Sequence, residues 1–223
     1  MTEQAPDYLI FGEKLHSIRL CSTHRGFFDP HDHGIDKIYS QSTACWRGYI
    51  VVYNCIHNEL VVDSLCLQIK ERQLINGITP SPHRPRLLAT GLAEFYTEGF
   101  NYYYENLRLK TDFSGDIIID QGMQILESFI SSGHKYSEDF RQPLVKIFEQ
   151  QGWPSSILGS PGSPVPKDAL EFIKKSKSQT SKLSFEKGHL ISQKLLNYGE
   201  ISAEIKDILS KRSILKSGDK KYK

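Results

Sequence analysis

The clearest hydrophobic pattern in the chain is a pair of short apolar runs separated by a polar turn. Residues 49–53 and 60–62 are dense in β-branched and aromatic side chains, and His57-Asn58-Glu59 stands between them. Such runs favour extended strands, and the polar residues between them predict a β-hairpin. Because apolar residues occupy consecutive positions, both faces of the hairpin should be covered. We therefore predict that it lies in the centre of a sheet.

Further elements follow from the same kind of pattern. Apolar or alternating segments predict strands over residues 8–11, 15–20, 101–110 and 116–120. Apolar residues at helical spacing predict helices over about 86–97, 123–131 and 143–151. Short turns join the strands, which favours antiparallel pairing. The expected fold class is α+β, a mainly antiparallel β-sheet with packed helices and a basic C-terminal helical segment.

The composition changes near residue 160. Residues 1–160 hold 14 Lys and Arg against 19 Asp and Glu, whereas residues 161–223 hold 14 against 7. Three prolines stiffen the segment 159–166, which is the best linker candidate. We therefore predict two units, a β-rich α+β body over 1–160 and a basic helical extension over 161–223.

Three helix-length stretches are expected after the linker, over about 167–177, 184–197 and 200–213. The third is the most regular, because its apolar residues recur at helical spacing: Ile201, Ile205, Ile208 and Leu209. Asp207 and Lys211 add an i,i+4 pair of favourable orientation. The extension should therefore consist of helices that dock either on the body or on a partner.

The positive charge of the extension indicates an acidic partner. It concentrates in two short groups: Lys174, Lys175 and Lys177, then Lys211 and Arg212. We expect these side chains to bind an acidic protein surface. Nucleic acid is the second partner class, through phosphate contacts, although the basic residues of the extension are not interleaved with aromatic residues as in a base-stacking platform.

The apolar runs are shorter than the roughly 20 residues that span a bilayer, and the N-terminus does not resemble a signal peptide. No membrane partner is therefore expected. The four cysteines, at 21, 45, 55 and 66, form no Cys-x-x-Cys pair. Cys55 and Cys66 lie within strand-like apolar runs, where a free thiol behaves as a small core residue. A disulfide or a zinc site is the alternative. The expected compartment is the cytoplasm.

Trp46-Arg47-Gly48-Tyr49 leads directly into the central hairpin. A tryptophan, an arginine and a tyrosine at the mouth of a buried strand suit stacking or carboxylate binding. Trp46, Arg47 and Tyr49 are therefore candidate binding residues. In the alternative interpretation Trp46 and Tyr49 belong to the core, and Arg47 pairs with a structural carboxylate.

No catalytic motif stands out, and no cofactor is predicted. His31 and His33 lie in a loop bounded by proline and glycine, which is typical of a solvated polar segment. The alternative function is an enzyme that acts on a small or nucleic substrate through residues 29–47, using His31, His33 and Arg47.

Two motifs stand out within residues 8–150. One is Ser42-Thr43-Ala44-Cys45-Trp46-Arg47-Gly48-Tyr49, followed by Leu60-Val61-Val62, and the other is Phe113-Ser114-Gly115-Asp116-Ile117-Ile118-Ile119. Together they resemble a family of uncharacterised bacterial proteins with a Ser-Thr-x-x-Trp-Arg-Gly-Tyr strand and a later Ser-Gly-x-Ile-x-Ile strand. This chain departs from the family pattern at Cys45, at Tyr53, where the family has tryptophan, and by a long insertion over 70–100. The resemblance implies one compact β-rich unit and no known activity.

The charge division and the lack of a reactive constellation favour one function over the others. We expect a non-enzymatic interaction protein, comparable to a small bacterial accessory or immunity-type subunit. It should bind another macromolecule through its basic C-terminal helices.

Overall fold

The computed structural model describes residues 5–23, 27–89, 91–120 and 180–218, together with the single positions 145 and 149. In this part of the chain, one sheet contains nine strands. They are β1 (Tyr8–Phe11), β2 (Lys14–Cys21), β3 (Tyr49–Ile56), β4 (Glu59–Leu67), β5 (Tyr102–Tyr104), β6 (Leu109–Lys110), β7 (Gly115–Asp120), β8 (Thr180–Glu186) and β9 (His189–Leu196).

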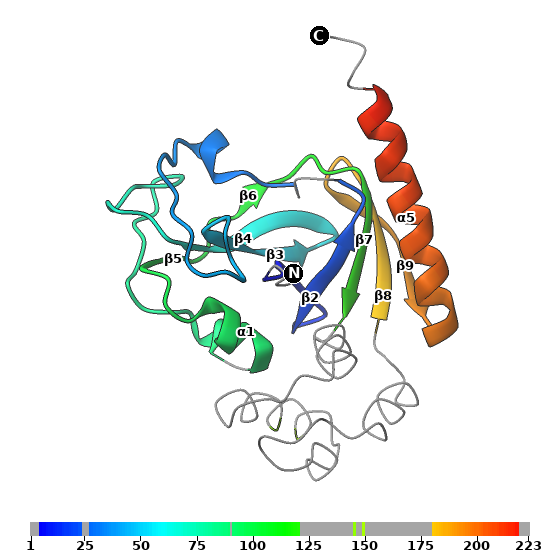
Figure 1. Ribbon diagram of the computed structural model, residues 1–223, viewed down its shortest axis with the longest axis horizontal. Helices are drawn as coiled ribbons and strands as arrows, with labels where there is room; N and C mark the ends of the chain where they lie inside the picture. Colours follow the sequence, from blue (N-terminus) through cyan, green and yellow to red (C-terminus); the bar gives the residue numbers. More distant parts are fainter. Residues whose placement is uncertain are drawn as a thin grey trace.

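Seven of these strands close into a barrel, which Figure 1 shows. Around the barrel they follow the order β1, β2, β7, β8, β9, β4 and β3, and β3 pairs with β1 to complete the ring. Neighbours are antiparallel except for β1 and β3, which are parallel. The short strands β5 and β6 pair with β4 outside the ring.

The predicted central hairpin is confirmed as β3 and β4. Their register runs from Tyr49 opposite Leu67 to Ile56 opposite Glu59. His57 and Asn58 form the turn with φ of 50° and 66°, a left-handed pair that matches the twist of a two-residue hairpin.

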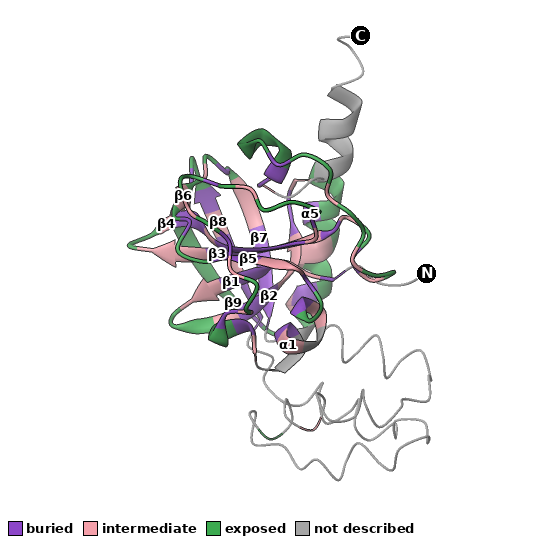
Figure 2. Ribbon diagram, turned by 90° about the vertical axis from the view of Figure 1, so that its left-hand side faces the viewer, coloured by how far each residue is buried: buried purple, intermediate pink, exposed green. Residues whose placement is uncertain are grey.

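Both faces of this hairpin are buried, as its consecutive apolar residues predicted. Val51 and Tyr53 point into the barrel interior, where they join the main core. Ile50 and Val52 point outward into a second core, which Leu88, Ala93 and Phe100 help to cover. Figure 2 shows the buried residues concentrated in the barrel strands, whereas many loop residues are exposed.

Two α-helices accompany the barrel in the described part of the chain, α1 (Gly91–Thr97) and α5 (Tyr198–Gly218). A short 3-10 helix, η2 (Arg86–Leu88), precedes α1, so the helix expected over 86–97 is two separate pieces. α5 covers the stretch expected over 200–213 and buries Ile201 and Ile208. In Figure 1 it lies beside β8 and β9. None of the described helices is long and apolar enough to cross a membrane.

The expected α+β class, with packed helices and a basic helical C-terminal segment, is wrong. The chain is mostly β and closes into a seven-stranded barrel. The stretch 184–197, expected to be helical, instead contributes the end of β8 and the whole of β9.

The helix prediction over 184–197 fails first because of a turn at Lys187 and Gly188. These two residues form a hairpin turn with φ of 49° and 79°. A Cβ on Gly188 would lie 2.1 Å from the Thr111 carbonyl oxygen, so the turn needs glycine there. β8 then pairs along its length with β7, whose isoleucines are fully buried. The turn and the tertiary pairing therefore make this helix-length segment a pair of strands.

Several sequence predictions lie outside the described residues. These are the helices over 123–131 and 167–177, the linker over 159–166, and the helix over 143–151 except for positions 145 and 149, which are helical.

Candidate functional site

Two tight turns lead into β3 and place the residues that the sequence singled out. The Cys45 N–H donates to the Ser42 carbonyl at 3.0 Å, and the Gly48 N–H donates to the Cys45 carbonyl at 3.1 Å. Trp46 and Arg47 occupy the two central positions of the second turn. We call residues 45–48 the Trp46 turn.

Gly48 holds the Trp46 turn against the neighbouring loop. Its φ is 74°, and a Cβ there would lie 1.9 Å from the Tyr39 carbonyl oxygen. The Gly48 carbonyl accepts a hydrogen bond from the Gln68 N–H at 2.9 Å, and the Tyr39 N–H donates to the Gln68 carbonyl at 2.8 Å. Only glycine allows this close approach of backbone to backbone.

Arg47 anchors the same turn from the other side. Its guanidinium contacts both carboxylate oxygens of Asp7, at 2.5 and 3.1 Å, and its Nε donates to the Tyr49 carbonyl at 2.7 Å. The guanidinium also lies over the Tyr49 ring, 4.9 Å from its centroid. Burial alone would lower the pKa of Arg47, but the Asp7 carboxylate outweighs it and raises that pKa above its usual value.

Asp7 connects this pair to the barrel. Its Oδ1 also accepts a hydrogen bond from the Val51 N–H at 2.8 Å. One carboxylate therefore holds both the turn and the start of β3. Arg47 is therefore paired within the chain. This is the alternative interpretation of the sequence, in which Arg47 pairs with a structural carboxylate.

Trp46 projects from the tip of this anchored turn with 69% of its surface exposed. Tyr49 is half-buried beneath Arg47. The preceding residues 38–45 contain no charged side chain, and Tyr39, Ser40, Ser42 and Thr43 are all exposed. The structure thus separates the three candidates: Arg47 and Tyr49 build the support, and Trp46 is presented to solvent.

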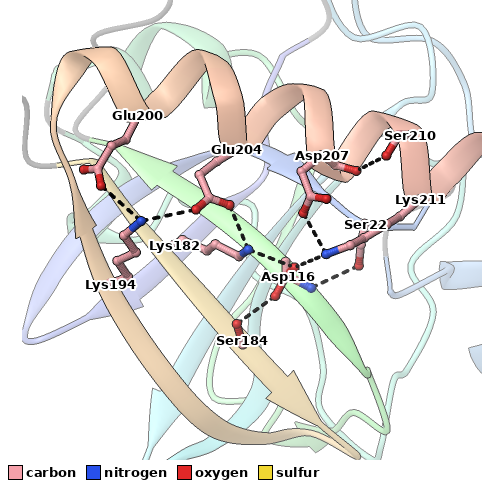
Figure 3. Close-up of polar contacts among 10 residues, drawn as sticks. All are labelled: Ser22, Asp116, Lys182, Ser184, Lys194, Glu200, Glu204, Asp207, Ser210 and Lys211. Carbon is pink, nitrogen blue, oxygen red and sulfur yellow. Dashed lines mark hydrogen bonds and ion pairs between the residues drawn. The ribbon is translucent and has the colours of Figure 1, made fainter.

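A second group of polar residues joins α5 to the barrel (Figure 3). Lys182 contacts Glu204 at 2.8 Å and Asp116 at 3.3 Å. Lys211 contacts Asp207 at 2.7 Å and Asp116 at 3.5 Å. We call the α5 network the seven charged residues Asp116, Lys182, Lys194, Glu200, Glu204, Asp207 and Lys211.

The remaining contacts extend the α5 network to β9. Lys194 contacts Glu200 at 3.1 Å and Glu204 at 3.4 Å. Ser184 on β8 donates a hydrogen bond to the Asp116 carboxylate at 2.7 Å. Asp116 therefore links β7, β8 and α5.

Neighbouring charges shift the pKa values within the network in opposite directions. Burial would raise the pKa of Asp116, but the hydrogen bond from Ser184 and the charge of Lys182 lower it. Burial would lower the pKa of Lys182, but Glu204 and Asp116 raise it. Both shifts favour the ionised pair and therefore stabilise the docked helix.

The α5 network shows that part of the positive charge of the extension is balanced by carboxylates of the same chain. Residues 180–211 hold five lysines and four carboxylates, a net charge of only +1. Lys211, a predicted binding residue, contacts Asp207 and Asp116 of its own chain. Arg212 continues the backbone of α5, while its side chain and Lys174, Lys175 and Lys177 lie outside the described residues.

The three residues of the alternative enzyme hypothesis, His31, His33 and Arg47, each contact a different group of the chain. His31 lies in the 3-10 helix η1 (Pro30–His33), and its Nδ1 is 2.7 Å from the Ile35 carbonyl oxygen. The His33 ring stacks on Phe28, with ring centroids 4.9 Å apart, and Arg47 is held by Asp7. Across the part of the chain that the structure describes, no three His, Cys, Asp or Glu side chains form a metal-binding group.

The cysteines serve packing. Cys21, Cys45 and Cys66 are buried, Cys55 is half-buried, and all four are free thiols. Burial raises the pKa of Cys45 and of Cys66, which disfavours the reactive thiolate. Cys66 is a core thiol, as expected, and Cys55 is half-buried and packs against the core.

Sequence reasoning missed Asp7 and Asp116, which lie far along the chain from their partners. Asp7 stands 40 positions from Arg47, and Asp116 stands 95 positions from Lys211. The one available signal was the position of each aspartate at the beginning of a predicted strand.

Comparison with known proteins found no matching family model, no matching curated protein and no matching solved structure.

Proposed function

We propose that this protein is a non-enzymatic binding module that recognises a partner protein through the Trp46 turn. The observation that carries this proposal is the exposure of Trp46, at 69%, on a turn that Arg47 and Gly48 hold in place. Tryptophan supplies a large apolar surface with few rotatable bonds, and it is among the residues that most often dominate the energy of interfaces.

The support beneath Trp46 favours binding for a second reason. A turn that is already ordered loses little conformational entropy when a partner covers it, so more of the contact energy appears as affinity. The bidentate Asp7–Arg47 pair and the close approach at Gly48 provide this order before any partner arrives.

The side chains before Trp46 indicate the chemistry of the partner. Residues 38–45 are uncharged, and their exposed members carry hydroxyl groups or an aromatic ring. Such a surface suits a protein with an apolar pocket and polar groups around it. A role as an accessory or immunity-type subunit is compatible with this surface, and the resemblance to the uncharacterised bacterial family stays a prediction.

An acidic partner remains the second candidate, because residues 161–223 hold 14 Lys and Arg against 7 Asp and Glu. Of the five cations named for it, Lys211 is paired with Asp116 and Asp207. Salt separates the two candidates. Binding through Trp46 should change little between 50 and about 300 mM salt, whereas binding through exposed lysines should weaken steeply.

The experiment compares partner capture by the wild-type chain, Trp46→Ala and Leu74→Ala. Leu74 is a matched control, because it is also a large apolar side chain in a loop and is 61% exposed. We expect Trp46→Ala to lose the partner and Leu74→Ala to keep it, with both variants folded. Equal capture by all three proteins would contradict the proposal.

A second measurement follows Trp46 directly. Trp153 is the other tryptophan of the chain, so Trp153→Phe leaves Trp46 as the single emitter. Its fluorescence should be typical of an exposed indole and should shift to shorter wavelength when the captured partner is added. An unchanged spectrum with bound partner would place the interface elsewhere.

A further inference from the structure

Residues 5–7, which precede β1, run beside the Trp46 turn. The Ala5 N–H donates to the Ala44 carbonyl at 2.5 Å, and the Arg47 guanidinium donates to the Ala5 carbonyl at 3.4 Å. Ala44 and Arg47 lie on the two sides of Trp46 in the chain. These contacts therefore hold the backbone of Trp46 from both directions. We call residues 5–7 the strap.

The strap reaches this position because β1 and β3 are parallel. Tyr8 lies opposite Val52, and Leu9 lies opposite Tyr53. Parallel neighbours begin at the same end of a barrel, so the residues before β1 lie next to the residues before β3, whereas antiparallel neighbours begin at opposite ends. The one parallel pair among the described strands of the ring therefore brings the strap and the Trp46 turn together.

The strap is fixed to the barrel by contacts that do not involve Arg47. The Asp7 carbonyl accepts a hydrogen bond from the Ile18 N–H of β2 at 2.8 Å, and the Asp7 carboxylate accepts one from the Val51 N–H of β3. Ala5 is 3% exposed and packs in the second core. Backbone hydrogen bonds and apolar packing therefore dock the strap, and the ion pair is one contact among several.

We propose that the strap is the positioning element of the Trp46 site, so that the Trp46 turn keeps its shape only while the strap is docked. Inside the turn, the Gly48 N–H donates to the Cys45 carbonyl. One such hydrogen bond contributes less than the conformational entropy lost by ordering the residues that it encloses. Gln68 supports the turn at Gly48, whereas residues 44–47 depend on the strap.

The coupling regulates the proposed binding site and, for the partner, rests on the proposed function. The order of the turn is measurable without a partner. A partner that binds the ordered turn favours the docked strap by the same factor by which the docked strap favours the partner. Displacement of the strap should therefore weaken binding, and a bound partner should hold the strap in place.

Native-state hydrogen exchange of the full chain tests the order of the turn without any substitution. If the strap and the turn open as one unit, the Ala5 and Gly48 N–H groups should show the same protection. A Gly48 N–H that is protected at least tenfold more strongly than the Ala5 N–H would overturn the inference, because the turn would then persist after the strap opens.

A substitution in the strap tests the same coupling through Trp46 itself. Ala5→Pro removes the N–H that donates to Ala44, whereas Ala5→Gly keeps it and is the matched control. Both are made in Trp153→Phe, where Trp46 is the single emitter. We expect Ala5→Pro to lower the fluorescence anisotropy of Trp46 and to accelerate exchange of the Gly48 N–H at least tenfold, with Ala5→Gly close to the parent. Unchanged anisotropy and exchange in folded Ala5→Pro would contradict the inference.

Partner capture separates this inference from the proposed function. We expect Ala5→Pro to raise the dissociation constant at least tenfold, and the Leu74→Ala control to bind as the wild type does. If Trp46→Ala loses the partner while Ala5→Pro binds it normally, the coupling is wrong and the proposed function stands. If Trp46→Ala keeps the partner, the proposed function fails, and the exchange measurements decide whether the strap orders the turn.

Discussion

The Trp46 turn and the face beneath α5 both depend on ion pairs, but they use them differently. At the turn, one arginine and one aspartate meet in a partly buried pair that determines a local backbone shape. Under α5, seven charged residues on four elements form a network that holds a helix on a finished sheet. A single pair can shape a presented loop, whereas a distributed network positions a whole element and can lose one member at a lower cost.

The largest expected effect comes from breaking the pair at the turn. Asp7→Asn removes the charge that compensates Arg47 and should lower the free energy of unfolding by about 3 kcal/mol, the low end for a buried pair. Urea denaturation measures it. If the loss is below about 1 kcal/mol, the pair does not determine the turn.

Gly48→Ala should cost roughly 2 kcal/mol, because the new Cβ would overlap the Tyr39 carbonyl and the backbone has a positive φ. Gly77→Ala is the matched control. Its φ is 75°, but nothing lies within 4 Å of the added Cβ. It should show only the conformational cost of about 1 kcal/mol. Equal losses in the two variants would show that the close approach at Gly48 contributes nothing.

The α5 network should respond to acid. Because the pKa of Asp116 is lowered in the folded state, its contribution is complete at neutral pH and is lost as the pH falls below about 4. Asp116→Asn should therefore cost about 1 kcal/mol at pH 7 and nothing near pH 2.

Thermal unfolding across this pH range measures the difference, with Glu186→Gln on the exposed end of β8 as control. A constant difference between Asp116→Asn and the wild type at all pH values would show that the carboxylate charge is not what holds α5.

The smallest effect on stability should be that of Trp46→Ala. An exposed side chain contributes little to folding, so the midpoint in urea should move by less than about 0.5 kcal/mol. A loss of about 3–5 kcal/mol, typical of a core aromatic, would place Trp46 in the interior and remove the basis of the proposed binding surface.

Sequence alone determined the elements whose signals are local. The hairpin of β3 and β4 was predictable because its β-branched runs and the turn at His57 and Asn58 act over a few residues. The core thiols and the helix over 200–213 were predictable for the same reason, since burial and helical spacing are local properties.

Tertiary structure decided which strands close the barrel and which charged side chains are paired within the chain. Residues 184–197 form a helix-length stretch, yet the pairing of β8 with β7 and of β9 with β8, together with the turn at Gly188, makes them strands. Lys211 was predicted to belong to a free basic surface, but it contacts Asp116, which lies on a strand far away in the sequence. The sequence left open whether Trp46 lies in the core or on the surface. The contact between Asp7 and Arg47 fixes the turn that exposes it, and contacts between residues far apart in sequence leave no local pattern.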